Sequence, residues 1–449
     1  MIPKKELSLF DSTCIIVGVI VGVGIYQMAP TVARGVYCWW GVLGIWMLGG
    51  VLSLFGALGY AELASAYPKE GGDYVYLSRA YGGWAGYLFG WIQLTIVRPG
   101  DIAVMAFAFA MYARTIYDPF TGSGLLYSQL FYAGASVFIL TIINILGVKE
   151  GKWMQNILTI VKILGLLAIV GVAIFSPPQG SAEITFEPIP TSLALIFVLF
   201  TFGGWNEMAY VAAEVKNPRR NIVRALLLGS IVVTVLYLMM NGAFLYTLGY
   251  DGLASSEAVA TESISSVFPE AGGKLIGVLV CISALGAVNG LIFTGARISY
   301  AMGAEHRIFG LLGRWHGRTG TPVWALSIQA VVALALILLF GSFVDTLLYT
   351  AGAVYLFYLA TSIAVIILRY KEPEIERPYR VTFYPVTTLI FSGVCIFLIY
   401  STVSYAWNEK RGSLVLLLVV LSLGVILYWL TNVVRSGTLG KCKKDGSKK

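Results

Sequence analysis

Long apolar segments fill most of the chain and constrain its fold more than any other feature. We identify twelve of them, at residues 12–33, 40–66, 83–113, 127–147, 153–175, 191–213, 222–248, 273–304, 322–341, 344–368, 384–407 and 413–435. A run of about 20 apolar residues is long enough to cross a bilayer as a helix. Only 12% of the residues are charged, whereas an ordinary soluble domain carries about twice that share. The sequence therefore excludes a soluble fold and predicts an all-α polytopic membrane protein with twelve transmembrane helices.

The lysines and arginines divide unevenly between the two sides of this predicted membrane domain. With the N-terminus in the cytoplasm, 23 of the 31 fall in cytoplasmic segments and five fall outside. An excess of basic residues is typical of cytoplasmic loops. We therefore predict cytoplasmic termini, a single transmembrane domain at 1–435, and a basic tail at 436–449 that is attracted to anionic lipid. The stretch at 69–80 is too polar to span and is predicted to form a short helix at the inner face.

Glycines interrupt the first and the sixth apolar segments, where a membrane helix should be most regular. Gly18, Gly22 and Gly24 lie in the first segment, and Gly203 and Gly204 lie in the sixth. Each glycine disfavours a helix interior by about 1 kcal/mol relative to alanine, although small residues can also serve close helix packing. In hydrocarbon, unwound backbone is tolerated where it lines a cavity. Paired interruptions in the two halves of a chain indicate the central site of a transporter, which we expect between these breaks.

Several ionisable residues lie inside apolar segments, where an unpaired charge is costly. Lys162 is near the middle of the fifth segment. Either its side chain snorkels to the membrane surface, or its ammonium group binds carbonyls freed in the first segment and joins them to the eighth. Asp101 follows Arg98 and Pro99 in the third segment, and it either pairs with Arg98 or contacts a cationic group of a substrate. Glu207 follows the break in the sixth segment, and both acids are candidates for binding a proton.

The sequence lacks the motifs that mark an enzyme, an ATP-driven pump or a metal site. It has no Gly-x4-Gly-Lys-Ser/Thr motif for binding nucleotide phosphates. Its two histidines, His306 and His316, lie in one loop without a cysteine or acid at metal-ligand spacing. The five cysteines form no CxxC pair. We expect no catalytic residue, no metal and no cofactor, and no nucleic-acid partner, because the basic residues follow the predicted topology.

Six stretches of the sequence carry a resemblance that covers most of the chain. They are VGVIVGVGIY in the first segment, YAELASAYPKEGGDYVYL after the second, WIQLTIVRP in the third, LFTFGGWNEMAYVAAEVKNPRRN in the sixth, SALGAVNGLIFTGARISYAMGAEHRIF in the eighth and RYKEPEIERPYRV before the eleventh. Together they resemble the amino acid–polyamine–organocation (APC) superfamily, and within it the L-type amino-acid transporters and bacterial serine/threonine exchangers. The resemblance implies a LeuT-like fold of two inverted five-helix repeats, at 12–175 and 191–368, with helices one and six broken and two further helices at 384–435.

The resemblance also implies where a substrate would bind. Backbone N–H groups at Gly22, Val23 and Gly24 would hold the substrate carboxylate, although the family usually has serine where this chain has Val23. If the sixth segment breaks at Gly203 and Gly204, carbonyls near Phe200 and Thr201 are left free, and such a helix end favours an ammonium group. The resemblance implies that Ile20, Phe200 and Gly203 hold the substrate amine, with the Phe200 ring closing over the substrate.

Other residues have expected roles around this site. Asp101 lies where similar transporters line the pocket for the substrate side chain, and Tyr237 is expected to offer a hydroxyl to the cavity. Lys162 resembles the lysine of sodium-independent carriers, in which a fixed charge replaces a cation. Glu62 and Arg297 are expected at an inner gate.

We therefore expect a sodium-independent secondary carrier of small or neutral L-amino acids, which exchanges substrates or couples to protons by alternating access. Val23 and Asp101 leave open a carrier of cationic amino acids or polyamines, and an amino-acid sensor that transports nothing is an alternative of another class. The loop at 114–126 lacks the cysteine of animal heteromers, and the chain has no Asn-x-Ser/Thr sequon. We expect a bacterial or archaeal cytoplasmic membrane, no disulfide-linked heavy subunit, and possible pairing with a small membrane partner.

Overall fold

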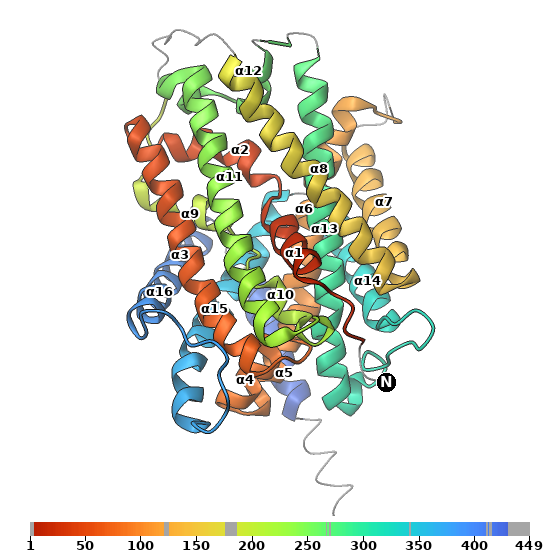
Figure 1. The fold of residues 1–449 in the computed structure, drawn as a ribbon. Coiled ribbons are helices and arrows are strands. Elements are labelled where there is room, and N and C mark those ends of the chain that lie inside the picture. The colour runs from red at the N-terminus through yellow and green to blue at the C-terminus, as the bar shows by residue number, and fades with distance from the viewer. Residues whose placement is uncertain are drawn as a thin grey trace, which may run out of the picture.

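The computed structural model describes residues 4–120, 125–175, 186–265, 267–268, 271–340, 343–409, 412 and 415–429. Within these residues the protein is a bundle of helices, most of which run along a common direction (Figure 1). In chain order they are α1 (Leu9–Ile20), α2 (Gly24–Ala33), α3 (Trp39–Ala66), α4 (Asp73–Tyr81), α5 (Gly83–Ile92), the π-helical turn η1 (Gln93–Val97), α6 (Arg98–Ile116), α7 (Leu125–Leu146), α8 (Val148–Phe175), α9 (Thr191–Thr201), α10 (Glu207–Tyr210), the 3₁₀ turn η2 (Ala212–Glu214), α11 (Pro218–Ser255), α12 (Val259–Ser265), α13 (Gly272–Glu305), the 3₁₀ turn η3 (Arg307–Phe309), α14 (Val323–Phe340), α15 (Phe343–Lys371) and α16 (Val386–Glu409). A last apolar helix covers Val415–Trp429.

Eight helices in the described part of the chain are long and apolar enough to cross a membrane, and the bent pair α1–α2 makes a possible ninth span. Three shorter apolar helices cover Thr191–Thr201, Val323–Leu339 and Val415–Trp429. Large apolar side chains remain exposed on the outside of the bundle, such as Leu164 of α8 and Ile396 of α16. Lipid tails are as apolar as these side chains, so exposure to them is not costly. The prediction of an all-α polytopic membrane protein is confirmed.

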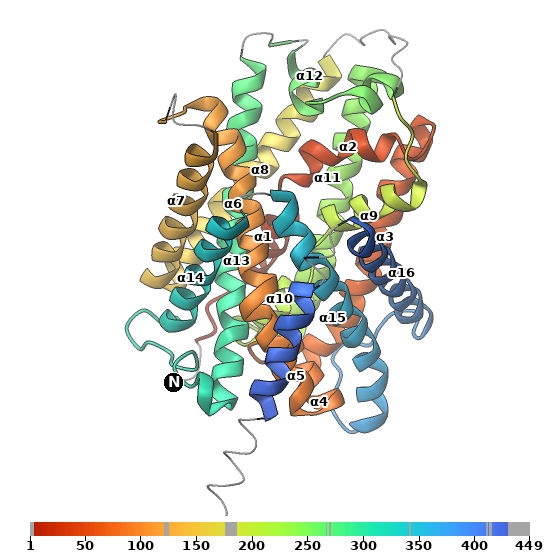
Figure 2. The same ribbon diagram turned by 180° about the vertical axis from the view of Figure 1, so that it is seen from behind.

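Helices α6 and α13 lie at the centre of the bundle (Figure 2). In the most apolar part of their spans 72% of the residues are buried, against 28% in α8. Two glycines of α13 allow its neighbours to come close. A Cβ atom on Gly290 would lie 2.4 Å from Val19, and one on Gly286 would lie 2.7 Å from the Nζ of Lys162. Small residues therefore bring α13 against α1 and α8, two helices that shape the centre of the molecule.

The short helix α4 crosses one end of the bundle, which we call the α4 face (Figure 1). It begins at Asp73, inside the polar stretch for which a short helix was predicted. The two residues before it have positive φ angles, +92° at Gly71 and +48° at Gly72. A Cβ atom on Gly72 would lie 2.8 Å from the Tyr210 ring. Only glycine fits this turn without strain, and the turn carries the start of α4 under the middle of the bundle.

Candidate substrate-binding site

The first predicted break is present between α1 and α2. Helix α1 ends at Ile20, α2 begins at Gly24, and their axes differ in direction by 49°. Carbonyl groups at the end of a helix have no partner within the helix. The hydroxyl of Ser283 on α13 lies 2.9 Å from the carbonyl oxygen of Val21 and 3.1 Å from that of Gly22, and it can donate to either. Side-chain hydrogen bonds therefore fix this break to α13.

Lys162 of α8 binds the same break. Its side chain is fully buried, and its Nζ donates to the carbonyls of Gly18 and Val21 at 2.8 Å each and to that of Ser283 at 3.0 Å. An ammonium group has three donors, so all three are used. The snorkelling interpretation is therefore wrong, and Lys162 joins α1 to α13 as the other interpretation expected. Its role in transport stays a prediction.

The second predicted break is present between α9, which ends at Thr201, and α10, which begins at Glu207. Its turn depends on Gly204, whose φ angle is +103°, because a side chain there would be strained and would lie 2.7 Å from Val19. The N–H of Gly203 donates to the carbonyl of Phe200 at 2.9 Å. The expectation that the Phe200 carbonyl is free was therefore wrong, because the turn folds back on it.

Tyr237 of α11 connects the two breaks. Its hydroxyl lies 2.9 Å from the carbonyl oxygen of Ile20 and 3.2 Å from that of Thr201. A hydroxyl has a single hydrogen, so it can donate to only one of these carbonyls at a time. The ring is fully buried and is not among the residues that line the cavity described below. The expectation that Tyr237 offers its hydroxyl to the cavity was therefore wrong in geometry, because the hydroxyl binds the ends of α1 and α9 behind the cavity wall.

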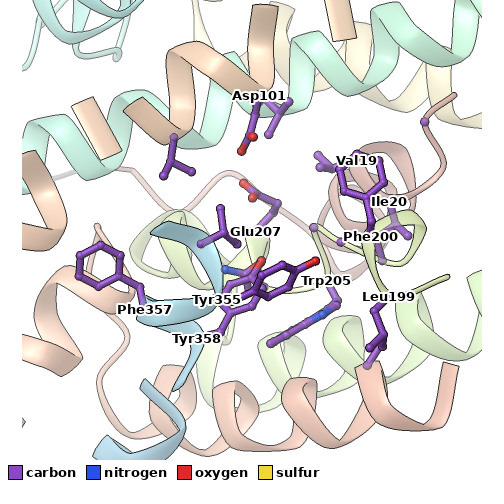
Figure 3. A pocket seen from close by; sticks show the side chains of 18 of the residues that line it. Val19, Ile20, Asp101, Leu199, Phe200, Trp205, Glu207, Tyr355, Phe357 and Tyr358 are labelled. Carbon is purple, nitrogen blue, oxygen red and sulfur yellow. The ribbon is translucent and has the colours of Figure 1, made fainter. Parts of the chain in front are cut away.

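A cavity of about 150 Å³ lies between the two breaks. Of the predicted site residues, those that line it are Ile20, Gly22, Gly24, Asp101, Phe200, Thr201, Gly203 and Glu207, whereas Val23, Lys162 and Tyr237 are not among the lining residues. Figure 3 shows Phe200 beside Val19 and Ile20 on one side and Phe357 on the opposite side. The carboxyl groups of Asp101 and Glu207 face the same space. The cavity therefore combines backbone from both breaks, aromatic walls and two acids.

Arg98 of α6 pairs with Glu207 across this cavity. Its two terminal nitrogens each lie 2.8 Å from a carboxylate oxygen, and both side chains are buried. Glu207 also accepts a hydrogen bond from Thr294 of α13 at 2.5 Å, and Gln93 accepts one from the Arg98 Nε at 3.2 Å. Bidentate arginine–carboxylate pairs are the strongest of their kind. The sequence analysis missed this pairing and considered Asp101 as the partner of Arg98, although two opposite charges in apolar segments are themselves a signal that the residues pair.

Asp73 also lines the cavity, on the side of the α4 face. Its carboxyl is buried and accepts hydrogen bonds from the hydroxyls of Tyr60 at 2.6 Å, Tyr210 at 2.8 Å and Thr361. The sequence analysis did not identify this residue. No sequence signal marked it, because α4 is a polar helix next to the bundle and only the glycine turn before it directs Asp73 inward.

Ion pairs join several helix ends at the α4 face. Glu62 of α3 binds Arg369 of α15 at 2.5 Å and lies 3.5 Å from Arg377. Arg297 of α13 binds Glu214 at 2.7 Å, and both side chains are fully buried. Glu62 and Arg297, which were expected at an inner gate, therefore hold separate elements together on one face.

The chain matches known proteins over most of its length. The family described as "Amino acid permease" matches residues 7–434. The b(0,+)-type amino acid transporter 1 of Mus musculus is 31% identical over 438 residues, which cover 95% of this chain and 88% of that protein. The large neutral amino acids transporter small subunit 2 of Homo sapiens is 32% identical over 452 residues, with 95% and 80% covered.

A bacterial relative has a similar level of identity. The serine/threonine exchanger SteT of Bacillus subtilis (strain 168) is 32% identical over 406 residues, which cover 89% of this chain and 91% of that protein. The resemblance inferred from six stretches of sequence is thereby confirmed. With two interrupted helices that enclose a cavity, and a family match from end to end of the helical bundle, the chain belongs to the amino acid permease family.

Proposed function

We propose that the protein is a sodium-independent secondary carrier that exchanges amino acids by alternating access around the central cavity. One observation carries the proposal: two interrupted helices, α1–α2 and α9–α10, meet at a cavity that both line. Transporters bind substrates at such pairs of half-helices near the middle of the membrane. The relatives named as amino acid transporters and as an exchanger support the same function.

The half-helix ends would hold the two charged groups of an amino acid. The N-terminus of α2 begins at Gly24, which lines the cavity, and a helix N-terminus favours a carboxylate. The C-terminus of α9 ends at Thr201 on the other side, and its negative dipole end favours an ammonium group. Val23 would contribute its backbone N–H alone, because it has no hydroxyl to add.

Independence from sodium follows in this proposal from Lys162. Its ammonium group occupies three carbonyls of α1 and α13, among them two beside the first break. Carbonyl oxygens of interrupted helices are the groups that coordinate a transported cation in many carriers. An ammonium group at this place would remove the need for one.

The proposed membrane arrangement has twelve spans, as two repeats at 12–175 and 191–368 and two further helices at 384–435. It follows from the eight long helices, the bent pair and the three shorter apolar helices taken together. The distribution of basic residues supports the α4 face as the cytoplasmic face, with both termini there, in a bacterial or archaeal membrane. The tail at 436–449 lies outside the described residues. No disulfide-linked subunit is proposed, because the loop at 114–126 contains no cysteine.

A carrier of cationic amino acids or polyamines is the second candidate, and the charges of the cavity favour it. Asp73, Asp101 and Glu207 line the cavity together with a single cation among the described residues, Arg98. A substrate with an extra positive charge would therefore enter a site in which acids outnumber bases. Asp101 is the residue we would expect to contact that charge.

Uptake into proteoliposomes tests the proposal and separates the candidates. We would measure alanine, leucine, arginine and putrescine in sodium-free buffer, with and without amino acid inside. Uptake of alanine or leucine that requires internal amino acid supports the exchanger. Uptake restricted to arginine or putrescine, and about tenfold weaker in Asp101→Asn for a loss of about 1.4 kcal/mol, supports the second candidate. The matched control is Asp118→Asn, a half-buried aspartate just beyond α6 that is not among the cavity residues.

Two results would reject a carrier. Ligand-dependent thermal stabilisation without flux of any of the four compounds would indicate a sensor that binds amino acids. Hydrolysis of an amide or ester by the purified protein would indicate an enzyme.

A further inference from the structure

Asp73 lies on the floor of the cavity although it belongs to a polar helix at the end of the bundle. The glycine turn before α4 explains its place. The N–H of Gly71 donates to the carbonyl of Tyr210 at 3.0 Å and holds the start of α4 against α10. The turn therefore places a carboxyl group between the proposed substrate site and the α4 face.

Three hydroxyl groups from three helices surround this carboxyl. Tyr60 of α3 and Thr361 of α15 donate to Oδ1, and Tyr210 of α10 donates to Oδ2. Hydroxyls can accept as well as donate. If Oδ2 carries a proton, it can donate to the Tyr210 oxygen, which also accepts from the Asn206 side-chain amide at 2.7 Å, while the two bonds to Oδ1 remain. This cage of hydroxyls can therefore hold the carboxyl in either protonation state, which lysine or arginine partners could not do.

The cation nearest the cage is already paired. Arg98 of α6 lies over the Tyr210 ring, 4.7 Å from its centre, but its guanidinium binds Glu207 of α10. Among the described residues, the other titratable groups around the cage are tyrosines. They are Tyr60 of α3, Tyr76 of α4, Tyr210 of α10 and Tyr358 of α15. Tyrosine ordinarily titrates near pH 10, so of these groups Asp73 is the one whose charge can change near neutral pH without breaking an ion pair.

We propose that Asp73 binds a proton while the α4 face is closed and releases it when that face opens, so that proton movement is coupled to transport. The inference rests on the proposed carrier function. Burial in the closed form favours the neutral carboxyl, and water admitted by opening favours the carboxylate. The proton enters through the cavity and forms the O–H bond at Oδ2. That bond breaks on opening, and the proton passes to water at the α4 face.

The pKa of Asp73 changes on burial in the direction that this proposal requires. Burial raises the pKa from 3.8 to about 6, while the three hydrogen bonds and the charge of Arg98 oppose the rise. A proton stabilises the form in which the group has the higher pKa. The closed form therefore gains stability as the pH falls below about 6 and loses it as the pH rises through that value.

Proton movement can be measured in proteoliposomes that contain the pH-sensitive dye pyranine and an amino-acid mixture of alanine, leucine and arginine. We expect addition of the same mixture outside, at lower external pH, to acidify the lumen of wild-type vesicles beyond the passive leak. Asp73→Asn should lower the number of protons that enter per labelled amino acid exchanged to that of the passive leak, at whatever rate the variant exchanges amino acid. The matched control is Glu305→Gln at the end of α13. Glu305 accepts a hydrogen bond from Tyr74, the neighbour of Asp73 on α4, and is not among the cavity residues. This control should acidify the lumen as the wild type does.

A second variant tests the inference independently if Asp73→Asn does not fold. Tyr210→Phe removes one donor to the carboxylate and should shift the midpoint of the pH dependence upward by about one pH unit, the value of one hydrogen bond to a charged group. Acidification by Asp73→Asn at the wild-type ratio would overturn the inference, as would an unshifted midpoint in Tyr210→Phe. Amino-acid exchange by the wild type without proton movement would also overturn it and leave the carrier function standing. No flux of amino acid at all would reject both.

Discussion

The two interruptions in the helical bundle meet at one cavity but are stabilised in different ways. The break between α1 and α2 depends on side chains from other helices, because Lys162 and Ser283 bind its carbonyls. The break between α9 and α10 depends on its own backbone, through the positive φ angle of Gly204 and the return of the chain onto the Phe200 carbonyl. The first break is therefore anchored to the surrounding helices. The second is a turn formed by its own backbone, and the side chain of Glu207 beyond it joins the turn to α6 and α13.

Lys162→Met tests whether the first break depends on side chains from other helices, and it should have the largest effect. It removes the donor of three buried carbonyls, of which that of Val21 keeps the Ser283 hydroxyl as a partner. Each carbonyl left without a partner costs about 1–3 kcal/mol, so we expect a loss of at least about 2 kcal/mol of stability and no transport. Thermal unfolding in detergent and uptake into proteoliposomes would measure both. The control is Lys152→Met on the same helix, whose pair with Asp11 is partly exposed and is worth less than about 1 kcal/mol. Equal losses in the two variants would show that the first break does not depend on its anchor.

Gly204→Ala tests the second break. A residue with a side chain is strained at a φ angle of +103°, and its Cβ would lie 2.7 Å from Val19. We expect a loss of about 2–3 kcal/mol in thermal unfolding. Gly242→Ala serves as the control, because a Cβ at this helical position of α11 meets no atom within 4 Å. If both variants unfold at the same temperature, the turn does not require glycine and the contrast between the breaks is lost.

Tyr237→Phe tests the link between the breaks and should have the smallest effect. The ring still packs against Trp46 and Phe202, at 5.5 and 5.0 Å between centres, so the change removes the hydroxyl alone. We expect about 1 kcal/mol less stability and a higher KM for uptake, because Ile20 and Thr201 are no longer held together. Tyr246→Phe on the exposed side of α11 should change neither quantity. An unchanged KM in Tyr237→Phe would show that the two breaks bind substrate independently.

The sequence predicted those features that follow from local chemistry. Both breaks lie where glycines interrupt apolar segments, and Lys162 reaches the first break because a buried ammonium group needs carbonyl partners. The sequence could not predict which partner a side chain contacts across the bundle. Arg98 and Glu207 lie on different helices far apart in the chain, so the neighbouring Asp101 was the natural first choice. The inward position of Asp73 depends on contact between the glycine turn and α10, which no local pattern reports.

The ion pairs at the α4 face have a consequence for the two directions of transport. If opening this face must break buried pairs such as Arg297–Glu214, the form open on that side is rarely populated. A ligand that binds only a rare form binds with an affinity reduced by the population of that form. We therefore expect the same site to show a higher KM for substrate on the α4 side than on the other side. The difference should be about tenfold for each 1.4 kcal/mol of free energy needed to open the α4 face. A carrier built in this way would collect scarce substrate on one side of the membrane and give it up readily on the other.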